Sequence, residues 1–206
     1  ENVALRLDEA SFTYAELHRA AAGIATGLRE RGIQPGDKVS LLVPNVPEFT
    51  MAYFGILYAG ATVVPINVLA AAPEVAYFLK DSESRLLIVH PLFEAPGRAG
   101  AEEMKVPVVM AGGEGPDSLA SLAASEPLDG PHPTGADSTA VILYTSGTTG
   151  HPKGAELTHS NLFMNCAVVV PRLVEIDPGE LRALATLPLF HSFGQTSIQN
   201  ATLAAG

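Results

Sequence analysis

Residues 139–154 read Thr-Ala-Val-Ile-Leu-Tyr-Thr-Ser-Gly-Thr-Thr-Gly-His-Pro-Lys-Gly, and this stretch decides how the rest of the chain is interpreted. Its first part, Thr139–Tyr144, is a short, mainly apolar run that predicts a buried β-strand. The strand leads directly into a loop of small residues: Thr145, Ser146, Gly147, Thr148, Thr149 and Gly150. Glycines let the backbone approach an anion closely, and hydroxyl and backbone N–H groups donate hydrogen bonds without adding bulk. The stretch therefore predicts a strand followed by an anion-binding loop.

Lys153 follows this loop and carries an isolated positive charge. It is the only Lys or Arg between Lys105 and Arg172, while residues 106–152 carry five acidic residues. A single cation beside a Gly/Thr loop suits a triphosphate or pyrophosphate group, with a metal ion supplying the other positive charge. The alternative is an exposed Ser/Thr/Gly loop with a solvated lysine. The preceding strand and the full Ser-Gly-Thr-Thr-Gly-x-Pro-Lys-Gly string favour phosphate binding over that alternative.

A Walker-type phosphate loop does not fit the same residues. That motif requires G-x-x-x-x-G-K-[ST] running into a helix. Here the spacing from Gly147 to Lys153 is wrong, and Pro152 stands where the motif requires glycine. The Walker-type interpretation therefore fails for this loop.

Apolar runs of strand length alternate with helical patterns along the chain. We expect strands at 38–43, 62–65, 85–90, 106–110, 139–144 and 184–187, and helices from the Thr13/Glu16 capping box to Gly32 and at 47–60, 73–80, 118–125, 160–170 and 192–205. Short continuous apolar strands between helices indicate a mostly parallel sheet covered on both faces. The predicted fold class is therefore α/β, with mostly parallel sheet layers flanked by helices.

Composition and charge exclude several classes of partner. The 206 residues include 12 Lys and Arg against 22 Asp and Glu, which gives a net charge of −10. Nucleic-acid and anionic-membrane surfaces need clustered cations, so we expect neither partner. The uncharged window from Phe49 to Pro73 is better explained by a helix ending at Gly60 and a short strand than by a transmembrane span. The single cysteine, Cys166, is expected in the core. Because one cysteine cannot form a disulfide bond within the chain, we expect a reducing, cytoplasmic location.

The 145–154 string resembles the signature phosphate loop of adenylate-forming enzymes, the superfamily of acyl-CoA synthetases, firefly luciferase and nonribosomal-peptide adenylation domains. Further segments are similar to motifs of that superfamily in the same order: 12–17, 57–67, 157–162 and 187–194. The resemblance covers essentially the whole chain. It implies that the chain is part of the large N-terminal domain of an adenylate-forming enzyme.

The resemblance also implies a reaction and its cofactors. A carboxylate attacks the α-phosphate of Mg²⁺-bound ATP to give an acyl-adenylate and pyrophosphate, and the thiol of coenzyme A then displaces AMP. By position, Thr145–Gly150 would wrap the β- and γ-phosphates, with Lys153 supporting them, and Thr148 or Thr149 would lie near the metal. His191 would border the carboxylate substrate; the alternative is a packed histidine bonded to backbone. No residue of the chain is assigned as catalytic.

The segment 187–194 favours an acyl-CoA synthetase, with a fatty acid as the expected substrate, over an amino-acid-activating enzyme. An aryl or amino acid is one alternative, and a non-catalytic nucleotide-binding or interaction module is another. The adenine, ribose, hinge and C-terminal lysine motifs of the family do not occur in residues 1–206. We therefore expect an incomplete N-terminal domain without the C-terminal domain, inactive alone and prone to self-association through exposed apolar surface.

Overall fold

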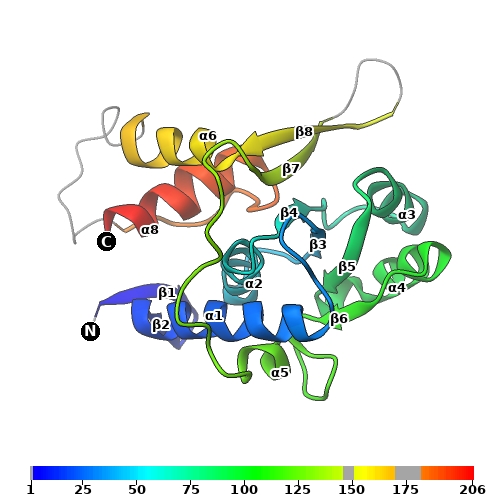
Figure 1. Cartoon of the computed structure of the whole chain (residues 1–206), viewed down its shortest axis with the longest axis horizontal. Coiled ribbons are helices and arrows are strands. Elements are labelled where there is room, and N and C mark those ends of the chain that lie inside the picture. The colour runs from blue at the N-terminus through cyan, green and yellow to red at the C-terminus, as the bar shows by residue number, and fades with distance from the viewer. Residues whose placement is uncertain (1, 146–150, 170–181) are drawn as a thin grey trace.

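The computed structural model describes residues 2–145, 151–169 and 182–206, and a largely parallel β-sheet lies at its centre (Figure 1). In spatial order the strands are β6 (Val108–Met110), β5 (Ser84–Val89), β3 (Lys38–Leu42), β4 (Thr62–Pro65), β7 (Thr139–Thr145) and β8 (Lys153–Thr158). Neighbouring strands are parallel except for β7 and β8, which are antiparallel. The apolar runs form strands buried on both faces, as parallel sheets require. The predicted α/β class is confirmed.

Helices cover both faces of this sheet. On one face lie α1 (Tyr14–Glu30), α2 (Pro47–Tyr58) and α5 (Leu119–Ala123); on the other lie α3 (Ala72–Asp81), the short η1 (Pro91–Phe93) and α4 (Glu94–Met104). Leu28 and Phe49 pack with Val63 in the first core. Phe78 packs with Val89 in the second. Each sheet face is therefore sealed by its own group of helices.

Helix α1 starts at the capping box that the sequence predicts. The backbone N–H of Glu16 donates to Thr13 Oγ1 at 3.2 Å, and the backbone N–H of Thr13 donates to Glu16 Oε2 at 2.7 Å. These two bonds satisfy donors that a helix start leaves without partners. The helix ends just before Gly32, whose φ of 86° lies in the left-handed region that glycine adopts readily.

Some elements were not predicted from the sequence. An antiparallel hairpin of β1 (Val3–Leu7) and β2 (Ala10–Thr13) precedes α1, and β8 adds an antiparallel edge to the main sheet. Helix α4 also forms, although its sequence contains Pro96, Gly97 and Gly100. A Cβ atom at Gly100 would lie 2.8 Å from Val75 Cβ, so the missing side chain allows α4 to pack closely against α3.

The predicted strand at Leu184–Leu187 is wrong. Residues 182–186 have no regular secondary structure. The amide of Asn45 donates through Nδ2 to the carbonyl oxygens of Ala185 and Leu187, at 2.8 Å each. A side chain therefore satisfies backbone groups that a neighbouring strand would satisfy in a sheet.

The C-terminal helices follow the predicted ranges with altered geometry. Residues predicted as one helix at 160–170 form α6 (His159–Phe163) and then a π-helix, η2 (Met164–Val169). The helix predicted at 192–205 contains a π-helix, η3 (Gly194–Asn200), followed by α8 (Ala201–Ala205). Cys166 is half-buried, so its predicted core position is wrong. In the described parts of the chain, no helix combines the length and apolar character needed to span a membrane.

Candidate functional site

The predicted phosphate loop connects the two strands of the β7–β8 hairpin. Thr145 is the last residue of β7 and Lys153 the first of β8, and the two are directly paired across the antiparallel ladder. Both residues are exposed at the end of the hairpin that leads into the loop. The other predicted phosphate-binding residues, Ser146, Gly147, Thr148, Thr149 and Gly150, lie outside the described residues, and so do both predicted metal-contacting hydroxyls. The hairpin therefore places the two ends of this loop side by side.

A cavity of about 290 Å³ opens where β4 and β7 end. Thr145 and His191 are 46 positions apart in the sequence, and both line this cavity, whereas Lys153 does not. Pro65 of β4 and Phe78 of α3 contribute to its wall. Ligands of open α/β sheets bind outside the carboxyl ends of the strands, which is where this cavity lies. The structure therefore brings Thr145, the first residue of the predicted phosphate loop, and His191 to one cavity.

His191 is exposed and is held by a compact turn. Its backbone N–H donates to the Pro188 carbonyl at 3.1 Å, and its own carbonyl accepts from the Gln195 N–H at 2.9 Å. Its ring lies 4.6 Å from that of Phe190, measured between centroids. His191 is therefore an exposed residue in the wall of this cavity, and its role toward a substrate stays a prediction.

Asn45 supports the segment that leads to His191, and sequence reasoning missed it. Asn45 lies between β3 and α2, and its Oδ1 accepts from the Leu189 N–H at 2.9 Å. Together with the two bonds to Ala185 and Leu187, this amide fixes the backbone before the turn. An Asn between a strand and a helix gives no long-range signal in the sequence, so only the fold reveals this contact.

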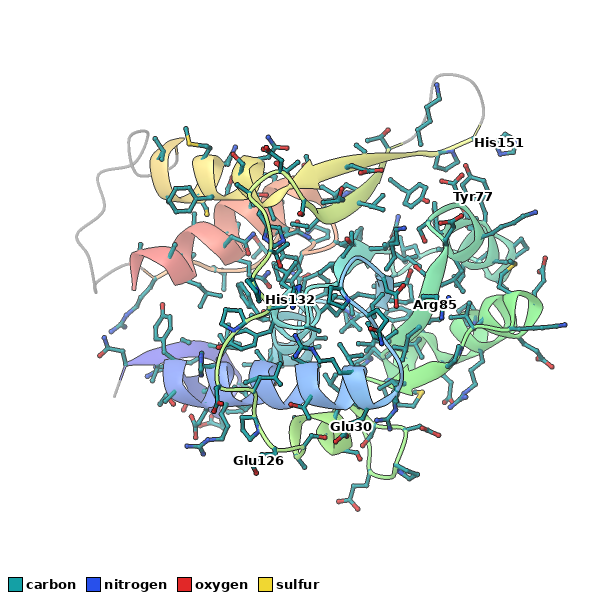
Figure 2. All side chains as sticks on the ribbon, in the orientation of Figure 1. Glu30, Tyr77, Arg85, Glu126, His132 and His151 are labelled. Carbon is teal, nitrogen blue, oxygen red and sulfur yellow. The ribbon has the colours of Figure 1, made fainter. Side chains whose placement is uncertain are left out.

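Side chains of α3 contact residues on both sides of the predicted phosphate loop, and sequence reasoning missed these too. The Tyr144 hydroxyl donates to Asp81 Oδ2 at 2.7 Å, and the Tyr77 hydroxyl donates to the Pro152 carbonyl at 2.7 Å. The rings of Tyr77 and His151 stack with centroids 5.8 Å apart (Figure 2). Burial, and then the neighbouring Asp81 carboxylate, raise the pKa of Tyr144 well above its usual range. The hydroxyl therefore remains a hydrogen-bond donor at neutral pH.

A buried polar chain connects α2 to the helix that follows His191. Thr50 Oγ1 donates to Gln199 Oε1 at 2.8 Å, and Asn200 Nδ2 donates to the Tyr53 hydroxyl at 3.1 Å. Burial raises the pKa of Tyr53 above its usual range. Buried polar groups that pair in this way fix the relative position of two helices. These hydrogen bonds thus hold the helix that follows His191 against the core of the domain.

The described residues contain no group of three or more His, Cys, Asp or Glu side chains that could hold a metal ion. By sequence, the predicted loop offers hydroxyl groups and one lysine rather than a group of carboxylates.

Comparison with known proteins agrees with this geometry. The model of the AMP-binding enzyme family matches residues 1–206. Feruloyl-CoA synthase from Amycolatopsis sp. is 39% identical over 207 residues, covering 98% of this chain and 39% of that protein. Long-chain-fatty-acid–CoA ligase FadD13 from Mycobacterium tuberculosis is 36% identical over 191 residues, covering 90% of this chain and 37% of that protein. The chain thus spans well under half the length of these relatives.

Solved structures share the fold over almost the whole chain. ATP-bound MatB from Rhodopseudomonas palustris superposes with a TM-score of 0.88 at 32% identity, covering 99% of this chain and 41% of that one. The anthranilate CoA ligase AuaEII, in complex with anthranoyl-AMP, superposes with a TM-score of 0.89 at 25% identity, covering 98% of this chain and 39% of that one.

Proposed function

The chain belongs to the AMP-binding enzyme family, and from that membership we propose that the protein carrying it is an AMP-forming acid–thiol ligase. In the proposed reaction a carboxylate attacks the α-phosphate of Mg²⁺-bound ATP, forming an acyl-adenylate and releasing pyrophosphate. The thiol of coenzyme A then attacks the acyl carbon and releases AMP. The feruloyl, fatty-acid and oxalate ligases among the relatives support thioester formation as the overall result.

The observation that carries the proposal is the shared cavity of Thr145 and His191. It joins the start of the phosphate loop to the segment that resembles the acyl-pocket motif. An acyl-adenylate connects a carboxyl group to a phosphate, so its formation requires both parts of the site within reach of one small molecule. The cavity at the ends of β4 and β7, which both residues line, supports the proposal.

The proposed role of the loop is electrostatic. Negative charge develops on pyrophosphate as it leaves, and hydrogen-bond donors and cations fixed around it lower the barrier. We assign this role to residues 145–150 and Lys153, whose ammonium group is exposed at the mouth of the hairpin. The magnesium ion neutralises phosphate charge as part of the substrate, and a hydroxyl of Thr148 or Thr149 is proposed to contact it. The proposed role of His191 is to border the carboxylate.

The 187–194 segment favours an acyl-CoA synthetase, and a fatty acid is the first substrate class that we propose. An aromatic acid is the second candidate, because a neighbouring cavity of about 300 Å³ has a mixed lining. Its polar lining side chains are Asn161, Asn165, Ser192, Thr196 and Ser197, and its apolar ones are Leu157, Leu162 and Phe193. Amide and hydroxyl groups suit a ring that carries polar substituents better than a plain alkyl chain. The 39% identity to a feruloyl-CoA synthase points the same way.

We further propose that residues 1–206 are an incomplete N-terminal domain that does not form acyl-adenylate when isolated, and that the enzyme acts in the cytoplasm. Exposed apolar side chains such as Phe163 and Phe193, 63% and 60% exposed, support self-association of the isolated chain. A second functional class, a nucleotide-binding module without chemistry, would retain ATP binding and lack turnover. Sedimentation of the isolated chain over a concentration series tests self-association: a strictly monomeric species contradicts it.

The acid is identified by incubating the complete protein with Mg²⁺-ATP, coenzyme A and single acids, and by detecting acyl-CoA and AMP by mass spectrometry. Palmitic acid, ferulic acid and oxalic acid form the core of the panel. Palmitoyl-CoA as the main product supports the fatty-acid assignment, and feruloyl-CoA supports the aromatic one. ATP binding without any thioester product contradicts the proposed function and favours the non-catalytic module.

A further inference from the structure

The outer half of the β7–β8 hairpin is weakly attached to the rest of the sheet. Within the described residues, β7 pairs with β4 at one position, Val63 with Val141, although β7 continues to Thr145. On the other side, β8 is an edge strand whose ladder partner is β7. Strand pairing therefore anchors the base of the hairpin and leaves its outer end, where Thr145 and Lys153 lie, to be held by other contacts.

Helix α3 supplies those contacts. Tyr77 donates its hydroxyl hydrogen to the Pro152 carbonyl at 2.7 Å, and Asp81 accepts from the Tyr144 hydroxyl at 2.7 Å. The bond from Tyr77 holds Pro152, the residue just before Lys153. The bond to Asp81 holds Tyr144, the residue just before Thr145. Because Tyr77 and Asp81 are four positions apart, they lie on the same face of α3.

Aromatic packing reinforces both bonds. The ring of Tyr144 lies 4.6 Å from that of Phe78 and 6.3 Å from that of Tyr77, and Tyr77 also stacks on His151 (Figure 2). Such aromatic pairs contribute beyond the area they bury. Phe78 belongs to the core shared by α3, α4 and β5, and Tyr144 packs against that core, so the hairpin end contacts a well-packed layer.

We propose that Tyr77 and Asp81 are positioning residues for ATP: by holding Pro152 and Tyr144, they fix the places of Lys153 and Thr145. This inference rests on the proposed function, in which those two residues face the nucleotide phosphates. Neither Tyr77 nor Asp81 touches the reacting atoms in this account. Their effect passes through the hairpin, and it acts on the nucleotide rather than on the carboxylate.

The test compares steady-state kinetics of the complete protein with those of single variants. Tyr77→Phe removes the bond to Pro152 and keeps the ring, and Asp81→Ala removes the acceptor for Tyr144. A hydrogen bond of this kind changes an equilibrium constant by about threefold to tenfold, so each variant should raise the KM for ATP by about that factor. The KM for the carboxylic acid should stay within about twofold of wild type, because neither variant changes His191 or the 187–194 segment.

Matched variants separate positioning from a general loss of structure. Asp81→Asn should keep the KM for ATP close to the wild-type value, unlike Asp81→Ala, because the amide oxygen of Asn still accepts from Tyr144. Tyr58→Phe is the control: its hydroxyl also makes a 2.7 Å hydrogen bond, to His18 Nε2, but away from the hairpin. It should leave both KM values unchanged. Equal rises in both KM values for Tyr77→Phe and Asp81→Ala would overturn the inference in favour of a general structural role.

Hydrogen–deuterium exchange of the same proteins provides a readout that does not depend on turnover. In Tyr77→Phe, the amides of Tyr144, Thr145, His151, Lys153 and Gly154 should exchange faster, while those of β3 and β4 keep their wild-type rates. Unchanged exchange at the hairpin end would overturn the inference even if the enzyme is active. If the wild-type protein activates no acid, the proposed function fails, and the exchange pattern still decides whether α3 holds the hairpin.

Discussion

Replacing Lys153 with alanine separates binding of phosphate from stability of the fold. The Lys153 side chain is exposed at the first position of β8, and none of the ion pairs found among the described residues includes it. Surface substitutions of this kind change the free energy of unfolding by no more than about 0.5 kcal/mol. Lys153→Ala should therefore leave the unfolding midpoint close to that of the wild-type protein.

The effect on ATP should be larger. A hydrogen bond that involves a charged group is worth about 1.5–3 kcal/mol, and an exposed lysine falls at the lower end of that range. Since about 1.4 kcal/mol corresponds to a factor of ten, the KM for ATP should rise about tenfold. We expect partial rather than complete loss of activity, because the magnesium ion and the loop donors still hold the phosphates.

The assay measures initial rates of thioester formation against ATP concentration at low and at high salt. Lys153→Arg keeps the charge and should lose less affinity than Lys153→Ala. Arg19→Ala, which removes an exposed charge from α1, is the control for net charge and should leave the KM for ATP unchanged. The ratio between Lys153→Ala and wild type should shrink at high salt, because mobile ions screen an exposed charge. A KM for ATP that is unchanged in Lys153→Ala, with the fold intact, would refute the assignment of Lys153 to the phosphates.

Two further predictions concern the segment that carries His191. Thr50→Val leaves the buried Gln199 Oε1 without its donor and should lower the free energy of unfolding by about 1–3 kcal/mol; an unchanged midpoint in denaturant would show that the bond contributes nothing. Gly194→Ala would place a Cβ atom 2.8 Å from the Pro188 carbonyl carbon, and the clash should cost about 1–3 kcal/mol and raise the KM for the acid by displacing His191. Wild-type values in both thermal unfolding and acid KM would contradict the second prediction.

Local signals in the sequence predicted the parallel sheet and its main helices. The apolar run at 38–43 and the Thr13/Glu16 capping box could be interpreted correctly because each depends on neighbouring residues alone. Strand β8 gave no such signal: most of Lys153–Thr158 is exposed, so no alternation of apolar residues marks it. The strand predicted at 184–187 was wrong for the opposite reason. Its apolar residues resemble those of a strand, but Asn45 makes the hydrogen bonds to the carbonyl oxygens of Ala185 and Leu187.

The candidate site was predictable only in part. Thr145 and His191 were identified from separate segments, and the fold brings both to one cavity. The contacts of Tyr77 and Asp81 with the hairpin were not predictable, because both residues follow the ordinary pattern of an amphipathic helix. Their importance arises from the position of α3 beside the hairpin end, which is a property of the tertiary structure.

The most direct test of the account measures carboxylate-dependent exchange of labelled pyrophosphate into ATP by the complete protein, in the absence of coenzyme A. Exchange requires reversible formation of an acyl-adenylate, so it reports the proposed first step alone. The account predicts exchange with at least one acid of the panel and none without acid. In Lys153→Ala, the KM for ATP in this exchange should be about tenfold higher than in the wild-type protein. ATP binding with no exchange for any acid would contradict the central claim that this fold activates a carboxylate.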